Sequence, residues 1–202
     1  MAEDHCFPEE AVQEIRQKVW ERFQQVAVEQ ISRFPIGPES AKVVGYPEEL
    51  VDSFPPSVTE AFAGVGNPFS LGRIKPGERV LDVGCGSGFD ALVAADLVGP
   101  TGWVVGLDMV PEMVRKARTN MDSLGAKQVL VLHGMAEALP LPDGSIDVVI
   151  SNGVINLLPA KSVLLKELHR VLKPQGRLMV ADMALERPLK PEALQDPDLW
   201  SQ

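Results

Sequence analysis

Residues 79–90 read Arg79-Val80-Leu81-Asp82-Val83-Gly84-Cys85-Gly86-Ser87-Gly88-Phe89-Asp90, and this stretch decides the fold of the chain. The run from Val80 to Val83 is short, apolar and β-prone, which is typical of a strand buried in a parallel sheet. Three glycines spaced GxGxG follow at once. They predict a tight turn with no side chain between the backbone and a bound ligand. We expect a helix from Phe89 to about Val98, with its N-terminal amides directed at the same ligand.

The spacing of these glycines argues against a dinucleotide. The dinucleotide fingerprint places its third glycine at position 89, where this chain has Phe89, so a pyrophosphate would be poorly held. Asp82 lies two residues before the first glycine, and Asp108 ends the next expected strand, Trp103–Asp108. A carboxylate at the tip of the second strand can accept hydrogen bonds from ribose hydroxyls, and an acid beside the turn suits a cation. S-adenosylmethionine carries an ammonium and a sulfonium and no phosphate, so it fits the pattern better than NAD or ATP. Taken alone, each aspartate is explained equally well without a ligand, as an ordinary helix N-cap or strand-end residue.

Composition and charge limit the partners that the chain can have. Its 202 residues, 45% hydrophobic and 23% charged, suffice for one α/β domain with an appendage. The net charge of −9, without a basic cluster, disfavours nucleic acid and anionic membranes and favours a small or neutral substrate. The acidic start does not resemble a secretory signal and no apolar run reaches transmembrane length, so we expect a cytoplasmic protein. With two cysteines, Cys6 and Cys85, neither a disulfide framework nor a metal site is expected.

The N-terminal part is expected to form a helical cap. Apolar residues recur at helical spacing from about Glu9 to Ile31, which predicts one amphipathic helix that packs on its own domain. Residues 34–70 are rich in proline and glycine, which favours short turns of helix, one of them with Ser57 as its N-cap. The linker that follows should pass over the mouth of the ligand site, where Asn67 can reach the ligand.

Beyond the glycine turn, strands and helices alternate. The expected elements are a helix at Pro111–Leu124, strands at Val129–His133 and Ile146–Ser151, a helix at Ser162–Leu172 and a strand at Leu178–Ala184. This alternation predicts the α/β class, a doubly wound parallel sheet that binds ligands beyond the carboxyl ends of its strands. We therefore divide the chain into a cap (1–63), a ligand-binding domain (64–186) and a C-terminal tail (187–202). The tail is short, polar and broken by prolines, so the chain is expected to lack further C-terminal strands.

Several of these motifs, in this order, resemble the class I S-adenosylmethionine-dependent methyltransferases. The resemblance covers about residues 64–185 and rests on residues 80–88, 105–108, 134–140, 142–149 and 168–178. It implies a Rossmann-like sheet of strand order 3-2-1-4-5, usually completed by an antiparallel pair that is not found here. It also implies S-adenosylmethionine as the cofactor and methyl transfer to a small molecule as the reaction. The residues expected to contact the cofactor are Asn67, Asp82, Gly84, Cys85, Gly86, Gly88, Asp108, Met109, Met135, Ala136 and Ser151.

Within that family, the chain is most similar in style to the arsenite methyltransferases. It shares with them the stretches 64–68, 88–90, 98–102 and 151–157. Members that methylate arsenite have a cysteine where this chain has Gly153, together with further cysteines, and trivalent arsenic needs several thiolates. The expected acceptor is therefore another small molecule. At the position of Met135, many relatives have an acid that binds the amino group of the adenine. In this chain, the backbone of Met135 and Ala136 is instead expected to recognise the edge of the adenine. A plain core role for Met135 explains the sequence equally well.

The sequence assigns no catalytic residue and no oligomeric state. In direct displacement at a sulfonium methyl group, a protein mainly aligns the reactants and keeps the site dry. Asn152 and Asn156 follow the fourth strand and are expected to orient the substrate, although both are equally well explained as loop caps. His133 ends the third strand and is a candidate base. Two alternatives stay open, a catalytically silent S-adenosylmethionine-binding protein and an NAD-linked oxidoreductase, which Phe89 disfavours.

Overall fold

The computed structural model describes residues 8–29, 34–184 and 186–187. Its α-helices are α1 (Glu9–Glu29), α2 (Pro38–Val43), α3 (Glu48–Ser53), α4 (Pro56–Thr59), α5 (Phe89–Val98), α6 (Pro111–Leu124) and α7 (Lys161–Val171). Its strands are β1 (Arg79–Val83), β2 (Trp103–Asp108), β3 (Val129–His133), β4 (Ile146–Asn152) and β5 (Leu172–Ala181). Short 3₁₀ helices lie at η1 (Pro68–Leu71), η2 (Gly99–Thr101) and η3 (Ile155–Leu157). The expected bounds of α5, α6, β2 and β3 are confirmed, and β4 is one residue longer than expected.

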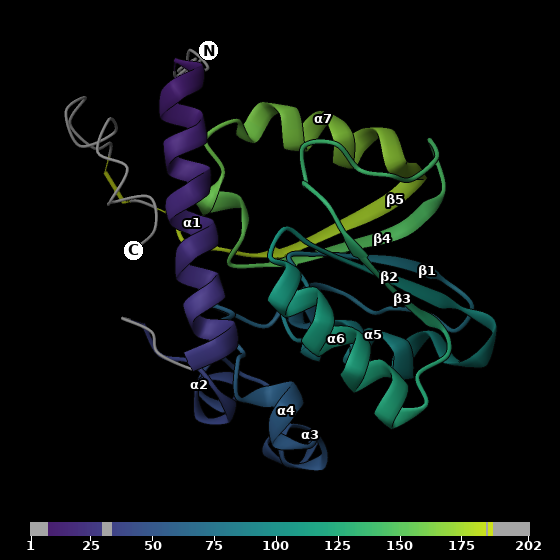
Figure 1. Cartoon of the computed structure of the whole chain (residues 1–202). Coiled ribbons are helices and arrows are strands. Elements are labelled where there is room, and N and C mark those ends of the chain that lie inside the picture. Colours follow the sequence, from purple (N-terminus) through teal and green to yellow (C-terminus); the bar gives the residue numbers. More distant parts are fainter. Residues whose placement is uncertain (1–7, 30–33, 185, 188–202) are drawn as a thin grey trace.

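The five strands form one parallel sheet in the order β3-β2-β1-β4-β5, which confirms the doubly wound topology. Helices α5 and α6 cover one face of this sheet and α7 covers the other (Figure 1). Val83 at the end of β1 lies opposite Leu107 of β2 and Ser151 of β4. The carboxyl ends of these strands therefore meet at one edge, which is where a doubly wound sheet binds its ligand.

The last strand differs most from its prediction. β5 begins at Leu172 rather than Leu178, because Leu172 already pairs with Ile146 of β4. The pairing register of β4 and β5 then shifts between Ile146 and Val148 before the regular part of the strand pair. The irregular stretch of β5 contains a proline and a glycine, which are atypical of strands, so the sequence did not indicate where the strand begins. The strand ends at Ala181, earlier than the expected Ala184. Helix α7 accordingly ends one residue earlier than expected.

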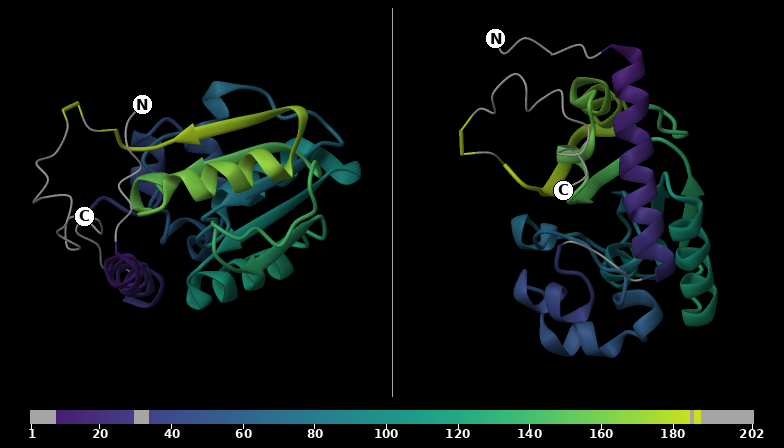
Figure 2. Two further views of the ribbon diagram at one scale, coloured as in Figure 1. Left: turned by 90° about the horizontal axis from the view of Figure 1, so that it is seen from above. Right: turned by 60° about the vertical axis from the view of Figure 1, so that its left-hand side comes forward.

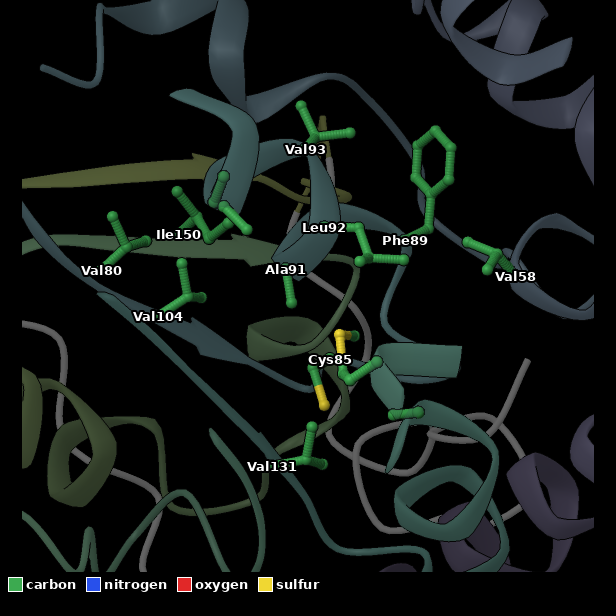
Figure 3. Packing of buried hydrophobic residues seen from close by; sticks show 14 of the residues in the cluster. Val58, Val80, Cys85, Phe89, Ala91, Leu92, Val93, Val104, Val131 and Ile150 are labelled. Carbon is green, nitrogen blue, oxygen red and sulfur yellow. The ribbon is translucent and has the colours of Figure 1, made fainter. Parts of the chain in front are cut away.

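The sheet separates two apolar cores. On one face, Val80 of β1 lies in the same buried cluster as Leu92 of α5 (Figure 3). On the other face, Leu81 of β1 lies in a cluster with Leu164 of α7. Consecutive strand residues thus serve opposite faces, which is why a buried parallel strand has a continuous apolar run.

Helix α1 stands across the sheet edge at which the strands end, as the two views of Figure 2 and the view of Figure 1 show. Its C-terminal half is fixed there because Val26 and Ala27 are buried against Val110 and Met113 at the start of α6. The helix therefore packs on its own domain, as its apolar spacing predicts. Its expected end at Ile31 lies outside the described residues.

Helix α4 begins differently from its prediction. Its N-cap is Pro55 rather than Ser57. The Ser57 hydroxyl instead donates a hydrogen bond to Asn120 Oδ1 of α6 at 2.7 Å. The local capping pattern was present in the sequence, but a partner distant in the chain uses the hydroxyl.

Two further predictions fall outside the described residues, namely those on Cys6 and on the tail from 188 to 202, including the expected lack of strands after β5. Within the described ranges, no helix is both long and apolar enough to cross a membrane. The same residues contain no group of three or more His, Cys, Asp or Glu side chains placed to hold a metal ion.

Candidate functional site

An open cavity lies at the carboxyl edge of the sheet. Its floor is the glycine turn after β1, and its walls are the loops that follow β2, β3 and β4. Helix α1 closes one side with Arg16, Val19 and Phe23. Segments from α1 to the loop after β4 therefore meet around one cavity.

The glycine turn is held in a conformation that favours glycine. Gly84 has φ +73°, and a Cβ added there would collide with the side chain of Val154. The backbone amides of Gly84 and Cys85 both donate to the Leu107 carbonyl of β2, at 2.8 and 3.0 Å. Gly86 has φ +53°, and a Cβ there would meet nothing within 4 Å. The turn is thus fixed to β2 while its outer surface stays open to a ligand.

Asp108 connects the tip of β2 to this turn. Its Oδ2 accepts a hydrogen bond from the Gly86 amide at 2.9 Å, and its Oδ1 accepts one from the Val110 amide at 2.9 Å. Burial raises the pKa of the carboxyl, and these amide hydrogen bonds oppose that effect. A carboxylate offers about four lone-pair directions, so Asp108 keeps capacity for further donors such as hydroxyls.

A second buried acid, Asp90 in the first turn of α5, lines the same cavity. Its Oδ1 accepts a hydrogen bond from the Tyr46 hydroxyl at 2.5 Å, and its Oδ2 accepts one from Asn152 Nδ2 at 3.1 Å. Burial raises the pKa of Asp90 to about 6, although both hydrogen bonds lower it. Tyr46 is also buried, and this burial together with the charge of Asp90 raises the pKa of its hydroxyl.

Asp82 is the third acid of this group and is fully buried in β1. Burial is the main reason that its pKa lies well above the ordinary value, and the charges of Asp90 and Asp108 add to it. Its Oδ2 has no hydrogen-bond partner among the described residues. Because the charges of Asp90 and Asp108 disfavour the ionised form of Asp82, a positive charge nearby would be stabilised.

Asn152 joins four segments at the end of β4. Its Oδ1 accepts hydrogen bonds from the amides of Val65 and Gly66, at 2.8 and 3.2 Å. Its Nδ2 lies within hydrogen-bond distance of the Gly66 carbonyl (2.9 Å), the Tyr46 hydroxyl (3.2 Å) and Asp90. Asn152 therefore holds the linker that precedes β1 against the sheet, although it also lines the cavity.

The structure brings some of the predicted site residues together and leaves others apart. Those that line the cavity are Gly84, Cys85, Gly86, Asp108, Met109, Met135, Ala136 and Asn152. Those that do not line it are Asn67, Asp82, Gly88, Ser151 and Asn156. Of this second group, Asp82, Gly88 and Ser151 belong to the strands and the turn beneath the cavity.

Asn67 does not line the cavity, and its side chain has partners within the protein. Its Oδ1 accepts a hydrogen bond from the Phe69 amide, which caps η1, and its Nδ2 donates to the Gly45 carbonyl. Asn156 likewise lies outside the cavity, where its amide donates to the carboxylate of Asp182. The contact of Asn156 is made by its backbone, and its side-chain Oδ1 is buried without a hydrogen-bond partner among the described residues.

Two other predicted residues have altered surroundings. His133 is exposed, and its Nε2 lies 3.1 Å from the Met109 carbonyl, away from the cavity lining, so the candidate base does not reach the site. The Cys85 thiol is buried, which raises its pKa well above the ordinary value. Figure 3 shows Cys85 with its sulfur among apolar neighbours such as Ala91 and Val131.

The sequence analysis missed an ion pair at the far end of the cavity. Arg16 Nη2 of α1 donates to Glu137 Oε1, in the loop after β3, at 2.9 Å. Glu137 follows directly on Met135 and Ala136, so the sequence could have indicated that it lies at the site. Its partner Arg16 could not be predicted in the same way, because it is distant in sequence. Tyr46 was missed for the same reason, and the signal available was that it is the one tyrosine of the chain.

Comparison with known proteins adds three findings. A family model described as a methyltransferase domain matches residues 74–202. An arsenite methyltransferase from Halobacterium salinarum is 44% identical over 135 residues, which are 67% of this chain and 34% of that protein. The crystal structure of an arsenic (III) S-adenosylmethionine methyltransferase from Chlamydomonas reinhardtii is 36% identical, covers 82% of this chain and 55% of its own, and has a TM-score of 0.64.

A further crystal structure, of a SAM-dependent methyltransferase from Aquifex aeolicus, is 29% identical with a TM-score of 0.55 and covers 78% of this chain and 80% of its own. By contrast, the chain spans between a third and a half of the length of the curated relatives that match it first.

Proposed function

Because the chain belongs to the class I S-adenosylmethionine-dependent methyltransferases, we propose that it transfers a methyl group from this cofactor to a small-molecule acceptor. The observation that carries the proposal is the cavity lined by the glycine turn, by Asp108 at the tip of β2 and by Asp90, with the buried Asp82 beneath it in β1. When bound, S-adenosylmethionine supplies an electrophilic methyl group on a sulfonium.

The cavity residues fit this cofactor chemically. We assign Asp108 to the ribose hydroxyls, because it ends β2 and keeps free lone pairs. We assign Gly84, Cys85 and Gly86 to the amino-acid end, because all three line the cavity and nothing lies within 4 Å of a Cβ built on Gly86. The buried carboxyls of Asp82 and Asp90 make that end favourable for a positive charge. The unpartnered Oδ2 of Asp82 supports the same assignment.

The purine is assigned to the opposite end of the cavity, beside Met109, Met135 and Ala136. Gly88 and Ser151 then act through the turn and the sheet rather than by contact. Ser151 is buried at the end of β4, and its hydroxyl has no partner among the described residues. The remaining predicted contact, that of Asn67, is not retained in this assignment.

The acceptor is proposed to be small and largely apolar where it meets the protein. Apolar residues in the cavity lining include Val19, Phe23, Val154, Leu157 and Leu158. Trivalent arsenic is a poor candidate for these 202 residues, because their two cysteines cannot supply several thiolates and the Cys85 thiol is buried. Asn152 keeps its proposed role of orienting the substrate, because it holds the linker that precedes β1. Asn156 keeps the same proposed role through the loop after β4, to which it belongs.

Charge and segmentation support four further proposals. The net charge of −9 favours a small-molecule partner over nucleic acid, and the same acidic composition is compatible with the proposed cytoplasmic location. We propose that residues 1–63 act as a cap on the cofactor-binding domain at 64–186. Residues 187–202 are proposed to be a tail outside that domain.

Calorimetric titration with S-adenosylhomocysteine, the demethylated product, tests cofactor binding. Wild type should bind saturably, and Asp108→Ala should lose most of the affinity because the ribose hydroxyls lose their acceptor. Asp122→Ala, an exposed acid on α6, is the matched control and should bind as wild type does. Absence of binding by wild type would refute the proposal.

Transfer of a labelled methyl group to a panel of small acceptors then separates an enzyme from a silent binding protein. Arsenite belongs in the panel as an acceptor that is expected to fail. Binding without transfer to any acceptor would favour the silent alternative.

A further inference from the structure

Strand β5 forms one edge of the sheet, and among residues 8–29, 34–184 and 186–187 its outer side has no strand neighbour (Figure 2). The Gly153 amide donates to the Ala181 carbonyl at 2.8 Å, so the backbone polar groups of Ala181 point toward β4. Because successive residues of a strand direct these groups to opposite sides, Leu178 and Val180 direct theirs outward. Outward groups of this kind are a template for another strand.

The opposite edge strand, β3, is guarded by a side chain. The Val104 amide of β2 donates to the Gln128 carbonyl, so by the same alternation Val131 directs its carbonyl away from β2. Arg118 of α6 donates to this carbonyl through both Nε and Nη2, at 3.0 and 2.8 Å. A side chain that occupies an outward carbonyl hinders the approach of another strand. β5 is therefore the less protected of the two edges.

The charged residues of β5 do not guard its edge, because they form ion pairs within the chain. Lys173 Nζ lies 2.7 Å from Asp147 Oδ1 of β4, and Arg177 Nη2 lies 2.8 Å from Glu78 Oε2. Native edge strands often prevent pairing with a charged side chain, lysine above all. Since these two charges are neutralised, the exposed side chain next to them is an apolar one, Leu178, which is 41% exposed.

An apolar strip accompanies this edge on the α7 side of the sheet. Met179 belongs to the cluster on the α5 side, so Leu178 and Val180 place their side chains on the α7 side. Leu165 of α7 is 48% exposed, and helix α7 packs on β5. Leu165 lies on the flank of α7 opposite to Arg170, which donates to carbonyls of the loop after β3. Leu165 therefore extends the strip beside β5.

We propose that β5 pairs in antiparallel orientation with β5 of a second copy of this chain, across a two-fold axis at Met179. In this register Leu178 of one copy lies opposite Val180 of the other, and these are the residues whose backbone groups point outward. Each such pair exchanges both backbone hydrogen bonds. Arg177 lies opposite Ala181, so no like charges face each other across the axis. The edge thus complements itself, as a two-fold interface requires.

This inference goes beyond the proposed function and does not depend on it. No residue of β5 lines the cavity, so dimer formation and ligand binding can be measured separately. Two other arrangements compete with the proposed one. In the first, a segment of the same chain occupies the β5 edge and the protein is a monomer. In the second, two copies associate through the β3 edge.

Sedimentation equilibrium of the full 202-residue chain distinguishes these arrangements. Wild type should have twice the 21.9 kDa mass of the chain. Leu178→Lys should raise the dimer dissociation constant by about tenfold or more, because a charge replaces an apolar cross-strand contact in both copies. Leu130→Lys is the matched control, since Leu130 is 55% exposed on β3, and it should dimerise as wild type does.

Val180→Pro tests the backbone hydrogen bonds without a change of charge. It removes an outward N–H and leaves the groups that pair with β4 in place, so it should fold and weaken the dimer as Leu178→Lys does. Circular dichroism and urea denaturation establish whether each variant is folded, and Leu178→Lys decides alone if Val180→Pro is not. S-adenosylhomocysteine should bind Leu178→Lys and wild type equally.

A monomeric wild type would overturn the inference, whether or not it bound S-adenosylhomocysteine. A dimer that the folded β5 variants leave intact, or that Leu130→Lys disrupts as strongly as Leu178→Lys does, would overturn it as well.

Discussion

Replacement of Asp90 by asparagine should change how the stability of the protein depends on pH. Burial raises the pKa of this carboxyl from 3.8 to about 6. Between these two values the folded protein binds more protons at this position than the unfolded chain does. Stability from this group is therefore fully present below the unfolded value and is lost as the pH rises through the folded value of about 6.

The size of the effect follows from the shift. About two pKa units correspond to about 3 kcal/mol, at about 1.4 kcal/mol per unit. Asparagine has no charge to bury, and it can keep both hydrogen bonds if the Tyr46 hydroxyl turns to accept while Asn152 still donates. Removal of the Asp90 charge also relieves Asp82, whose pKa that charge helps to raise. The free energy of unfolding of Asp90→Asn, relative to wild type, should rise by about 2 kcal/mol between about pH 4.5 and about pH 7.5.

Urea denaturation followed by far-UV circular dichroism at the two pH values measures this difference directly. Asp96→Asn is the matched control, since Asp96 is exposed on the same helix, and it should track wild type at both pH values. A difference between Asp90→Asn and wild type that is the same at both pH values would refute the reasoning.

Three further outcomes are expected. Gly84→Ala should lower the free energy of unfolding by about 2 kcal/mol and weaken S-adenosylhomocysteine binding, because φ is +73° and the new Cβ would meet Val154; unchanged urea denaturation would contradict this. Tyr46→Phe removes one donor from a buried carboxylate and should cost about 1.5–3 kcal/mol in urea denaturation near neutral pH. In a Cys6→Ser background, the buried Cys85 thiol should react with a disulfide reagent slowly in buffer and rapidly in urea; equal rates would show that it is exposed.

The sheet and the glycine turn were predictable because their signals are local. The apolar run of β1, the glycines after it and Asp108 at the end of β2 lie within one unit of about 30 residues, and their chemistry follows from spacing alone. β5 was not predictable to the same degree. Its first residue, Leu172, pairs with β4 before the register shifts, and no local pattern encodes that pairing.

The roles of polar side chains were predicted less well, because a side chain can use partners that are far away in the sequence. Ser57 matched a capping pattern but donates to Asn120. Asn67 matched a ligand-facing position, but its Nδ2 donates to the Gly45 carbonyl, 22 residues earlier in the chain. In both cases the residue was identified as polar and placed near the right element, and tertiary contacts decided what it binds.

The contacts that complete the site join segments that the sequence separates widely. Tyr46 is 44 residues from Asp90 and donates to it, and Asn152 lies 62 residues beyond Asp90 and also donates to it. The cap, the first helix of the sheet domain and the end of β4 are therefore connected through one buried carboxylate. Because a buried carboxylate is costly unless its donors stay in place, movement of the cap or the linker changes the electrostatics of the cavity. Under the proposed assignment of this cavity to the cofactor, Tyr46→Phe is expected to alter ligand affinity even though Tyr46 does not line the cavity.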